Sequence, residues 1–254
     1  MRVFDTSFDY KTDKPAKNRP DADRDSPRLR LDHELLWTKE LPSGVTFAPT
    51  PPSRRRDGYL IFTDASEDRH WYGSDAITSS YTTWSKSKSK TLFNAIAALD
   101  EDEKSRYLNP PYTIGSSMIW PVRKKHPKTM NRARGFRLLV ADRMDLTLEC
   151  IRRHYTGEPG SPLVDVTTAY ADFFELFDGF KEFVEFFHFQ DLVTRDYDRV
   201  EFYLPFDNFK RSGTPATKNE YVTYREKTLG FIEKRSGRMA EWVMEHHPEI
   251  EVRQ

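Results

Sequence analysis

Apolar residues at helical spacing mark the clearest structural segments of the chain. Between residues 138 and 155 they recur at intervals of four, four, three and four, at Val140, Met144, Leu148, Ile151 and Tyr155. This is the period of a single helix face. Residues 219–245 are amphipathic in the same way, and Ser26-Pro27 supplies an N-cap and a first-turn proline for a short helix that reaches Trp37. The pattern predicts helices over 138–155, 219–245 and 27–37.

A phenylalanine-dense segment lies between residues 166 and 192. Its eight rings are Phe173, Phe174, Phe177, Phe180, Phe183, Phe186, Phe187 and Phe189. They are too many for one narrow apolar stripe, so we expect a central and largely buried helix. Asp178-Gly179 marks a kink or a break in it.

Strand patterns are short and few. Runs near 45–47, 59–62, 112–120 and 199–206 predict strands, whereas the polar stretch 64–90 predicts a long ordered loop or irregular strands. Helices outweigh strands, and the two do not alternate as βαβ units. We therefore expect a single α+β domain over 28–254, helix-rich, with a small mixed or antiparallel sheet. Residues 1–27 predict an extended or disordered N-terminal arm.

Charge is balanced in sum but segregated along the chain. The 254 residues carry 40 Lys and Arg against 40 Asp and Glu, and the composition excludes a disordered chain, a coiled coil and a collagen-like chain. From Lys104 to Ala141 there are nine positive charges and no Asp or Glu. From Asp165 to Asp191 there are seven negative charges against one. We call these segments the basic block and the acidic block.

Cysteine usage and hydropathy bear on location. The single cysteine, Cys150, excludes an intramolecular disulfide framework. The polar start of the chain lacks the apolar core of a signal peptide, and no window is apolar enough to span a membrane. We expect a cytoplasmic protein with no membrane partner.

The basic block is the first candidate for ligand binding. Arginine presents a planar, bidentate fork to phosphate, and Gly135 permits close backbone approach, so Arg132, Arg134 and Arg137 predict a phosphate site. The alternatives are that this face docks against the acidic block or is merely solvated. On the adjoining helix, Asp145 and Glu149 are like charges one turn apart, which suits either a functional carboxylate or a salt-bridge ladder.

Further polar residues accompany this block. Tyr112, Ser116 and Ser117 could line a pocket beside it, and Arg143 could join the same pocket. Glu185 and His188 have the Glu-x-x-His spacing of a helical metal pair, but the chain offers no second helical copy. We therefore assign no metal site, and the sequence identifies no cofactor.

Several motifs together resemble an uncharacterised bacterial family, a domain of unknown function. They include Leu41-Pro42-Ser43-Gly44, Tyr112-Thr113-Ile114-Gly115, Ala133-Arg134-Gly135-Phe136, the run from Asp142 to Tyr155, and Gln190-Asp191-Leu192-Val193. The resemblance extends over nearly the whole chain. It implies a single bacterial cytoplasmic unit but no activity.

The sequence favours an enzyme or toxin-like effector that acts on a nucleotide or a nucleic acid. In this hypothesis the arginines bind phosphate, and Asp145 or Glu149 supplies a carboxylate. The alternative is a non-catalytic module whose charged faces bind a partner protein. Convergence of Arg134, Arg137, Arg143 and Glu149 on one pocket would favour the enzyme.

Overall fold

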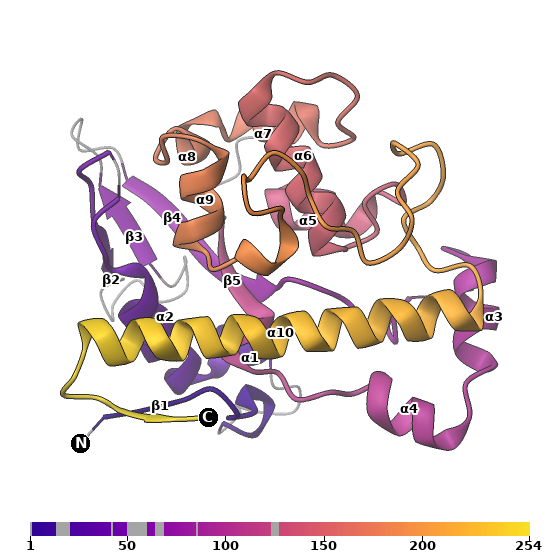
Figure 1. The fold of residues 1–254 in the computed structure, drawn as a ribbon, viewed down its shortest axis with the longest axis horizontal. Coiled ribbons are helices and arrows are strands. Elements are labelled where there is room, and N and C mark those ends of the chain that lie inside the picture. Colours follow the sequence, from indigo (N-terminus) through magenta and orange to yellow (C-terminus); the bar gives the residue numbers. More distant parts are fainter. Residues whose placement is uncertain are drawn as a thin grey trace.

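A long C-terminal helix, α10, runs beneath a small sheet and a group of short helices in the computed structural model (Figure 1). The structure describes residues 2–13, 21–41, 43–49, 60–63, 69–84, 86–122 and 127–254. The helices are η1 (Tyr10–Thr12), α1 (Ala22–Asp25), α2 (Pro27–Trp37), α3 (Lys90–Ala97), α4 (Glu101–Tyr107), η3 (Ile114–Ser116), α5 (Met130–Phe136), α6 (Met144–Thr156), α7 (Val164–Ala169), α8 (Ala171–Phe174), α9 (Phe180–Phe186), η4 (Gln190–Leu192) and α10 (Lys218–His246). The strands are β1 (Val3–Asp5), β2 (Phe47–Pro49), β3 (Leu60–Thr63), β4 (Arg69–Ala76), β5 (Ser117–Pro121) and β6 (Glu251–Arg253). The expected helix-rich α+β fold is confirmed.

The described strands form two sheets. The larger is antiparallel in the order β2-β3-β4-β5, and its register places Ser74 opposite Ile119 and Asp75 opposite Met118. The second pairs β1 with β6 in parallel, joining the two ends of the chain. β4 lies within the stretch expected to be a loop or irregular strands, and 199–206, expected to be a strand, makes only an isolated bridge between Val193 and Val200. That second prediction was wrong, because alternation alone does not supply a pairing partner.

Local signals account for several helix ends. Ser26 accepts a hydrogen bond from Leu29 N at 3.0 Å, and Pro27 follows it, so α2 begins as predicted. Asp100 and Glu103 form a capping box at the start of α4. Helix α6 begins only at Met144, not at 138, because Ala141 and Asp142 adopt left-handed backbone angles (φ 53° and 58°). A helix cannot pass through two such residues.

The phenylalanines are buried as expected, but the single long helix predicted for them is wrong. The segment forms α7, α8, α9 and η4, with α9 beginning after Gly179. Their rings contact one another, with centroids 5.0 Å apart for Phe183 and Phe187 and 5.3 Å apart for Phe177 and Phe183. Short helices at different angles direct these rings into one core, which a single rod would not do.

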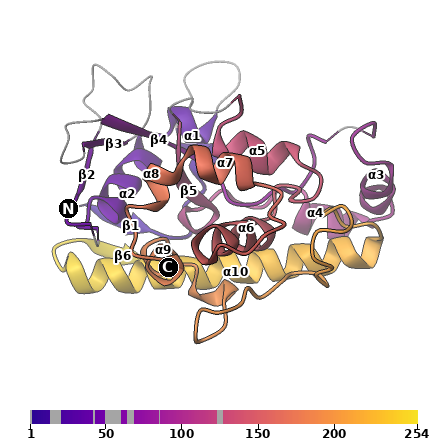
Figure 2. The ribbon, with the colours of Figure 1, turned by 90° about the horizontal axis from the view of Figure 1, so that it is seen from above.

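Residues expected as an N-terminal arm are built into the fold where the structure describes them. Phe4 and Tyr10 are fully buried, and the Tyr10 hydroxyl donates to Asp32 Oδ2 at 2.6 Å. Figure 2 shows β1 and β6 together near one end of α10. Burial of these two rings explains why residues 3–12 pack into the fold despite the polar composition around them.

Candidate functional site

A cavity of about 390 Å³ opens between α5, the segment that follows β4, and the connection from α5 to α6. We call it the α5 pocket. Its lining residues are Asp75, Thr83, Trp84, Lys88, Asn131, Arg132, Gly135, Phe136 and Asp142. The pocket therefore combines two carboxylates, an amide, two cations and two large aromatic rings.

Two aspartates form the acidic part of the pocket. Asp75, near the end of β4, accepts a hydrogen bond from Asn131 Nδ2, and burial together with the charge of Asp23 raises its pKa to about 7. Burial also raises the pKa of Asp142, against the opposing effect of Arg134 and Lys88. Carboxylates with raised pKa values in a cavity are typical of functional sites.

Arg134 holds the side chain of Asp142 in place. Its side chain is fully buried, and Nη1 lies 2.7 Å from Asp142 Oδ1 and 3.0 Å from the carbonyl oxygen of Ala76. Nε donates to Thr147 Oγ1 at 3.2 Å. The guanidinium thus joins β4, α6 and the left-handed turn that carries Asp142. Arg134 is a positioning residue and does not line the pocket.

Aromatic and cationic side chains form the walls and rim. Lys88 Nζ lies 3.2 Å from the ring centroid of Trp84 and 5.2 Å from that of Phe136, and it donates to the carbonyl oxygen of Gly135 at 3.0 Å. Phe136 is 61% exposed, a large apolar surface for a side chain at a cavity mouth. The exposed Arg132 stands beside it on α5.

A buried polar relay lies on the other face of β4. Trp37 Nε1 donates to His33 Nδ1 at 2.8 Å, so the imidazole proton resides on Nε2 and is donated to Ser74 Oγ at 2.8 Å. Ser74 Oγ donates in turn to Asp23 Oδ1 at 2.7 Å. Burial lowers the pKa of His33 to about 3, so the His33 ring is uncharged at neutral pH. It is not a nucleophilic triad, because the carboxylate accepts from the serine and not from the histidine.

Tyr112 belongs to this relay. Its hydroxyl donates to Asp23 Oδ1 at 2.5 Å. Tyr112 does not line the α5 pocket; its partner is Asp23, whose charge raises the pKa of Asp75. The sequence placed Tyr112 beside the basic block but gave no sign of this partner.

The other predicted residues lie elsewhere. Arg137 makes a bidentate pair with Asp165, at 2.5 and 2.6 Å. This contact joins the basic block to the acidic block. Such docking was one of the alternatives that the charge pattern left open. Arg123, Lys124 and Lys125 fall outside the described residues.

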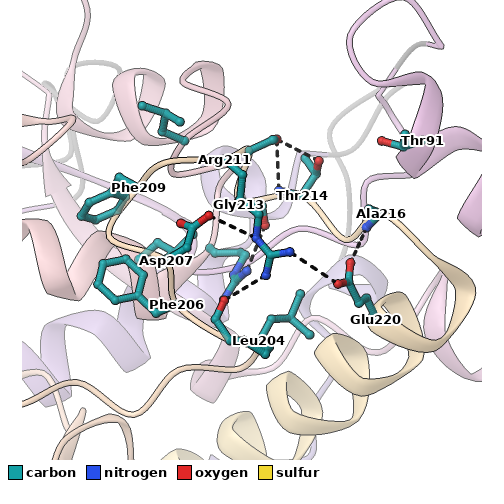
Figure 3. A pocket seen from close by; sticks show the side chains of 15 residues that line it. Thr91, Leu204, Phe206, Asp207, Phe209, Arg211, Gly213, Thr214, Ala216 and Glu220 are labelled. Carbon is teal, nitrogen blue, oxygen red and sulfur yellow. Dashed lines mark hydrogen bonds and ion pairs between the residues drawn. The ribbon is translucent and has the colours of Figure 1, made fainter.

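A second, smaller cavity of about 130 Å³ is lined by Leu204, Phe206, Arg211 and Glu220 among others (Figure 3). Arg143, which also lines it, forms a buried ion pair with Asp145. Asp145 is fully buried and also accepts a hydrogen bond from Tyr203 N at 2.9 Å. At the mouth, Arg211 lies 3.3 Å from Asp207 and 3.9 Å from Glu220. The charged groups of this cavity are therefore paired. Arg132 at the α5 pocket differs, because its side chain makes no hydrogen bond or ion pair with the described residues.

Glu149 is held within its own helix. Its oxygens lie 2.8 Å from Arg152 Nε and 2.7 Å from Arg153 Nε, which is the salt-bridge ladder that was the alternative to a catalytic carboxylate. The structure does not bring Glu149 to the same cavity as Arg134, Arg137 or Arg143.

Ser116 and Ser117 bond to local backbone. Ser116 Oγ donates to the carbonyl oxygen of Thr113 at 2.7 Å, and Ser117 Oγ to that of Ile114 at 3.1 Å. Both are buried. Gly115, just before them, packs against α10, where a Cβ would lie 2.4 Å from the carbonyl oxygen of Ile232. This segment serves helix packing and does not line the α5 pocket.

Metal-ligating side chains do not gather in the part of the chain that the structure describes. No group of three or more His, Cys, Asp and Glu side chains is placed there to hold a metal ion. Among the described helices, none combines the length and hydrophobicity that a bilayer crossing requires. Cys150 is buried, and burial raises the pKa of its thiol to about 12.

The fold and the α5 pocket together define a single-domain α+β protein with an acidic, aromatic-walled cavity. The chain belongs to a family of unknown function, DUF6994, whose sequence model matches residues 4–239. No curated protein and no solved structure matches the chain. The expected resemblance to an uncharacterised family is therefore confirmed.

Proposed function

We propose that the protein is an enzyme acting on a nucleotide, or on the terminal nucleotide of a nucleic acid, bound in the α5 pocket. The observation that carries the proposal is the pairing of two carboxylates of raised pKa with the aromatic walls of Trp84 and Phe136. Flat rings offer stacking surfaces to a base, and carboxylates accept hydrogen bonds from its ring and exocyclic N–H groups. In this proposal Asp75 and Asp142 supply the carboxylates, in place of the predicted helix residues Asp145 and Glu149.

In this proposal the cations at the rim of the pocket bind the phosphate. Arg132 is exposed and directed by α5 to the pocket, so its guanidinium is available for a bidentate phosphate contact. A base that stacks on Trp84 displaces Lys88 from that ring and frees its ammonium for the same phosphate. The rim is therefore positive where the interior is acidic, which matches the two ends of a nucleotide.

Asp75 is the proposed general base. A pKa of about 7 leaves a comparable share of carboxylate and carboxylic acid at neutral pH, the range in which proton transfer by a side chain is most effective. Asn131 Nδ2 donates to one oxygen of this carboxylate and Ala76 N to the other, which fixes its orientation in the cavity. An ionised base of this kind activates water or a ribose hydroxyl.

The test measures binding first and turnover second. Titration of the protein with the four ribonucleoside monophosphates and with a short single-stranded RNA, followed by calorimetry, should give saturable binding that weakens with salt. Phe136→Ala should weaken binding about 10-fold, since base stacking on an aromatic is worth about 1–3 kcal/mol. Phe93→Ala, which removes an exposed ring (44%) that does not line the pocket, is the matched control.

Turnover separates an enzyme from a binding module. Asp75→Asn should abolish product formation in a chromatographic assay of the bound ligand, while stacking on Trp84 and Phe136 and the phosphate contact of Arg132 still bind the nucleotide. If neither nucleotides nor RNA bind at millimolar concentration, the proposal is refuted.

A non-catalytic protein-binding module is the second candidate. It is favoured by exposed apolar side chains in the segment that follows α5, Leu138 at 41% and Leu139 at 38%, since adjacent exposed leucines are typical of interaction surfaces. Under either function we place the protein in the cytoplasm, which accords with its lone buried thiol. The toxin-like role is the nucleic-acid form of the enzyme proposal, and cleavage of cellular RNA on expression would support it.

A further inference from the structure

A third cavity, of about 420 Å³, lies between the C-terminal end of α9 and the last turns of α10. We call it the Lys39 pocket. Its inner wall carries Lys39, Phe186, His188, Gln190 and Trp242. None of these residues contributes to the α5 pocket, so the two cavities are independent.

Three aromatic rings lie around the Lys39 amine. Its Nζ lies 4.5 Å from the ring centroid of Phe186, 4.8 Å from that of Trp242 and 5.7 Å from that of Trp37. It donates to the carbonyl oxygen of Phe186 at 3.2 Å. Packing against these rings removes part of the half-buried Lys39 side chain from water, and this burial lowers its pKa to about 8. A desolvated amine at the wall of an open cavity is the setting in which lysine becomes a nucleophile.

His188 adds a second unusual group to the same wall. It is 5% exposed, and its backbone is in the left-handed region (φ 56°), which is rare for a residue with a side chain. Its Nε2 is buried without a hydrogen-bond partner among the described residues, as is Gln190 Oε1. Burial lowers the pKa of His188 to about 2, so the ring is neutral. The pocket therefore holds unsatisfied polar atoms next to a desolvated amine, a combination typical of a ligand-binding site.

The mouth of the pocket is acidic. Glu182 and Glu185 come from α9, and Glu241 and Glu245 from α10. The one arginine of the lining, Arg238, is paired with Asp191 at 2.6 Å. The field at the entrance therefore favours a cationic or neutral molecule over an anion.

We propose that Lys39 is a covalent binding site that forms a Schiff base with a small aldehyde, preferentially a cationic one. The neutral amine adds to the carbonyl carbon, forming the C–N bond of a carbinolamine. Both amine protons then leave with the carbonyl oxygen as water, and the C=N bond forms. No oxidant or reductant takes part, and the step is reversible in water.

Reductive trapping tests the proposal. The 254-residue chain is incubated at about pH 7.5 with sodium cyanoborohydride and one of three probes, namely betaine aldehyde, propionaldehyde or succinic semialdehyde, and peptide mapping locates the adducts. At this pH an amine of pKa about 8 is roughly one-quarter neutral, whereas an ordinary lysine near 10.4 is about one-thousandth neutral. Allowing for the weaker nucleophilicity of the less basic amine, Lys39 should be labelled at least about 10-fold faster than the exposed Lys234 on α10.

Variants and charge order decide the outcome. Lys39→Arg keeps the positive charge but should abolish the fast adduct, while Lys234→Arg should not affect it. The cationic aldehyde should label Lys39 fastest, the neutral one more slowly and the anionic one slowest. Raising the salt concentration should reduce the differences between these three rates. The rate should rise with pH through about 8. The titratable and charged groups that line the pocket with Lys39 are Glu182 and Glu185 from α9, His188 from the connection between α9 and η4, and Arg238, Glu241 and Glu245 from α10.

Two results would overturn the inference. Labelling of Lys39 no faster than Lys234 would show that the amine is not activated or not accessible. Faster labelling by succinic semialdehyde than by betaine aldehyde would contradict the cationic class of ligand. Neither result depends on nucleotide binding at the α5 pocket.

Discussion

Replacing Asp75 with asparagine should stabilise the protein at alkaline pH. The folded-state pKa of Asp75 is about 7, above the ordinary value of 3.8, so the folded protein holds this proton more tightly than the unfolded chain does. Stability is therefore lost as pH rises from 3.8 to about 7, and the full loss persists above that. At about 1.36 kcal/mol per pH unit the loss is about 4 kcal/mol at pH 8 and about 1.6 kcal/mol at pH 5. The asparagine side chain would carry no such charge.

Urea denaturation at pH 5 and pH 8 measures this difference. The free energy of unfolding of Asp75→Asn, relative to the native protein, should rise by about 3 kcal/mol between the two conditions. Asp178→Asn removes an exposed carboxylate and is the matched control, with no comparable rise. If the relative stability of Asp75→Asn is the same at both pH values, Asp75 is not held protonated by its surroundings, and its assignment as general base fails with it.

Three further changes test packing and charge, each by urea denaturation at pH 7. Phe187→Ala empties a fully buried site in the phenylalanine core and should lose about 3–5 kcal/mol; a loss below about 1 kcal/mol would contradict the core. Arg134→Met leaves the carboxylate of Asp142 beside an apolar side chain and should lose about 3–5 kcal/mol, whereas the exposed Arg132→Met should change stability little. Gly115→Ala brings a Cβ against α10 and should destabilise, while Gly237→Ala, in the open interior of α10, should gain up to about 1 kcal/mol; equal effects would refute the close approach.

Local sequence signals were sufficient for the helices that carry their own caps. Ser26-Pro27 marks the start of α2, where the cap joins residues three positions apart, and the Asp100–Glu103 box at α4 is equally local. The start of α6 depends instead on left-handed angles at Ala141 and Asp142. Tertiary contacts hold the chain at those angles, since Asp142 is paired with Arg134. The spacing of apolar residues does not predict such contacts.

The candidate site was predictable only in part. The sequence predicted that part of the basic block binds a ligand, and Arg132, which lines the α5 pocket, belongs to that block. Asp75 was missed as a functional carboxylate, because its stretch lacked clear strand alternation and its partner Asn131 lies 56 residues further along the chain. The raised pKa comes from burial, Asp23 and Asp142, none of which is visible from the neighbours of Asp75 in sequence.

The parallel pairing of β1 with β6 sets the order in which the protein can mature during synthesis. Residues 3–5 leave the ribosome long before their partners, residues 251–253. Helix α10, which supplies the buried Tyr221, Tyr224 and Phe231, also emerges late. The nascent chain therefore leaves the apolar surface that α10 covers exposed until this helix has left the ribosome, and this is where chaperones can bind during synthesis.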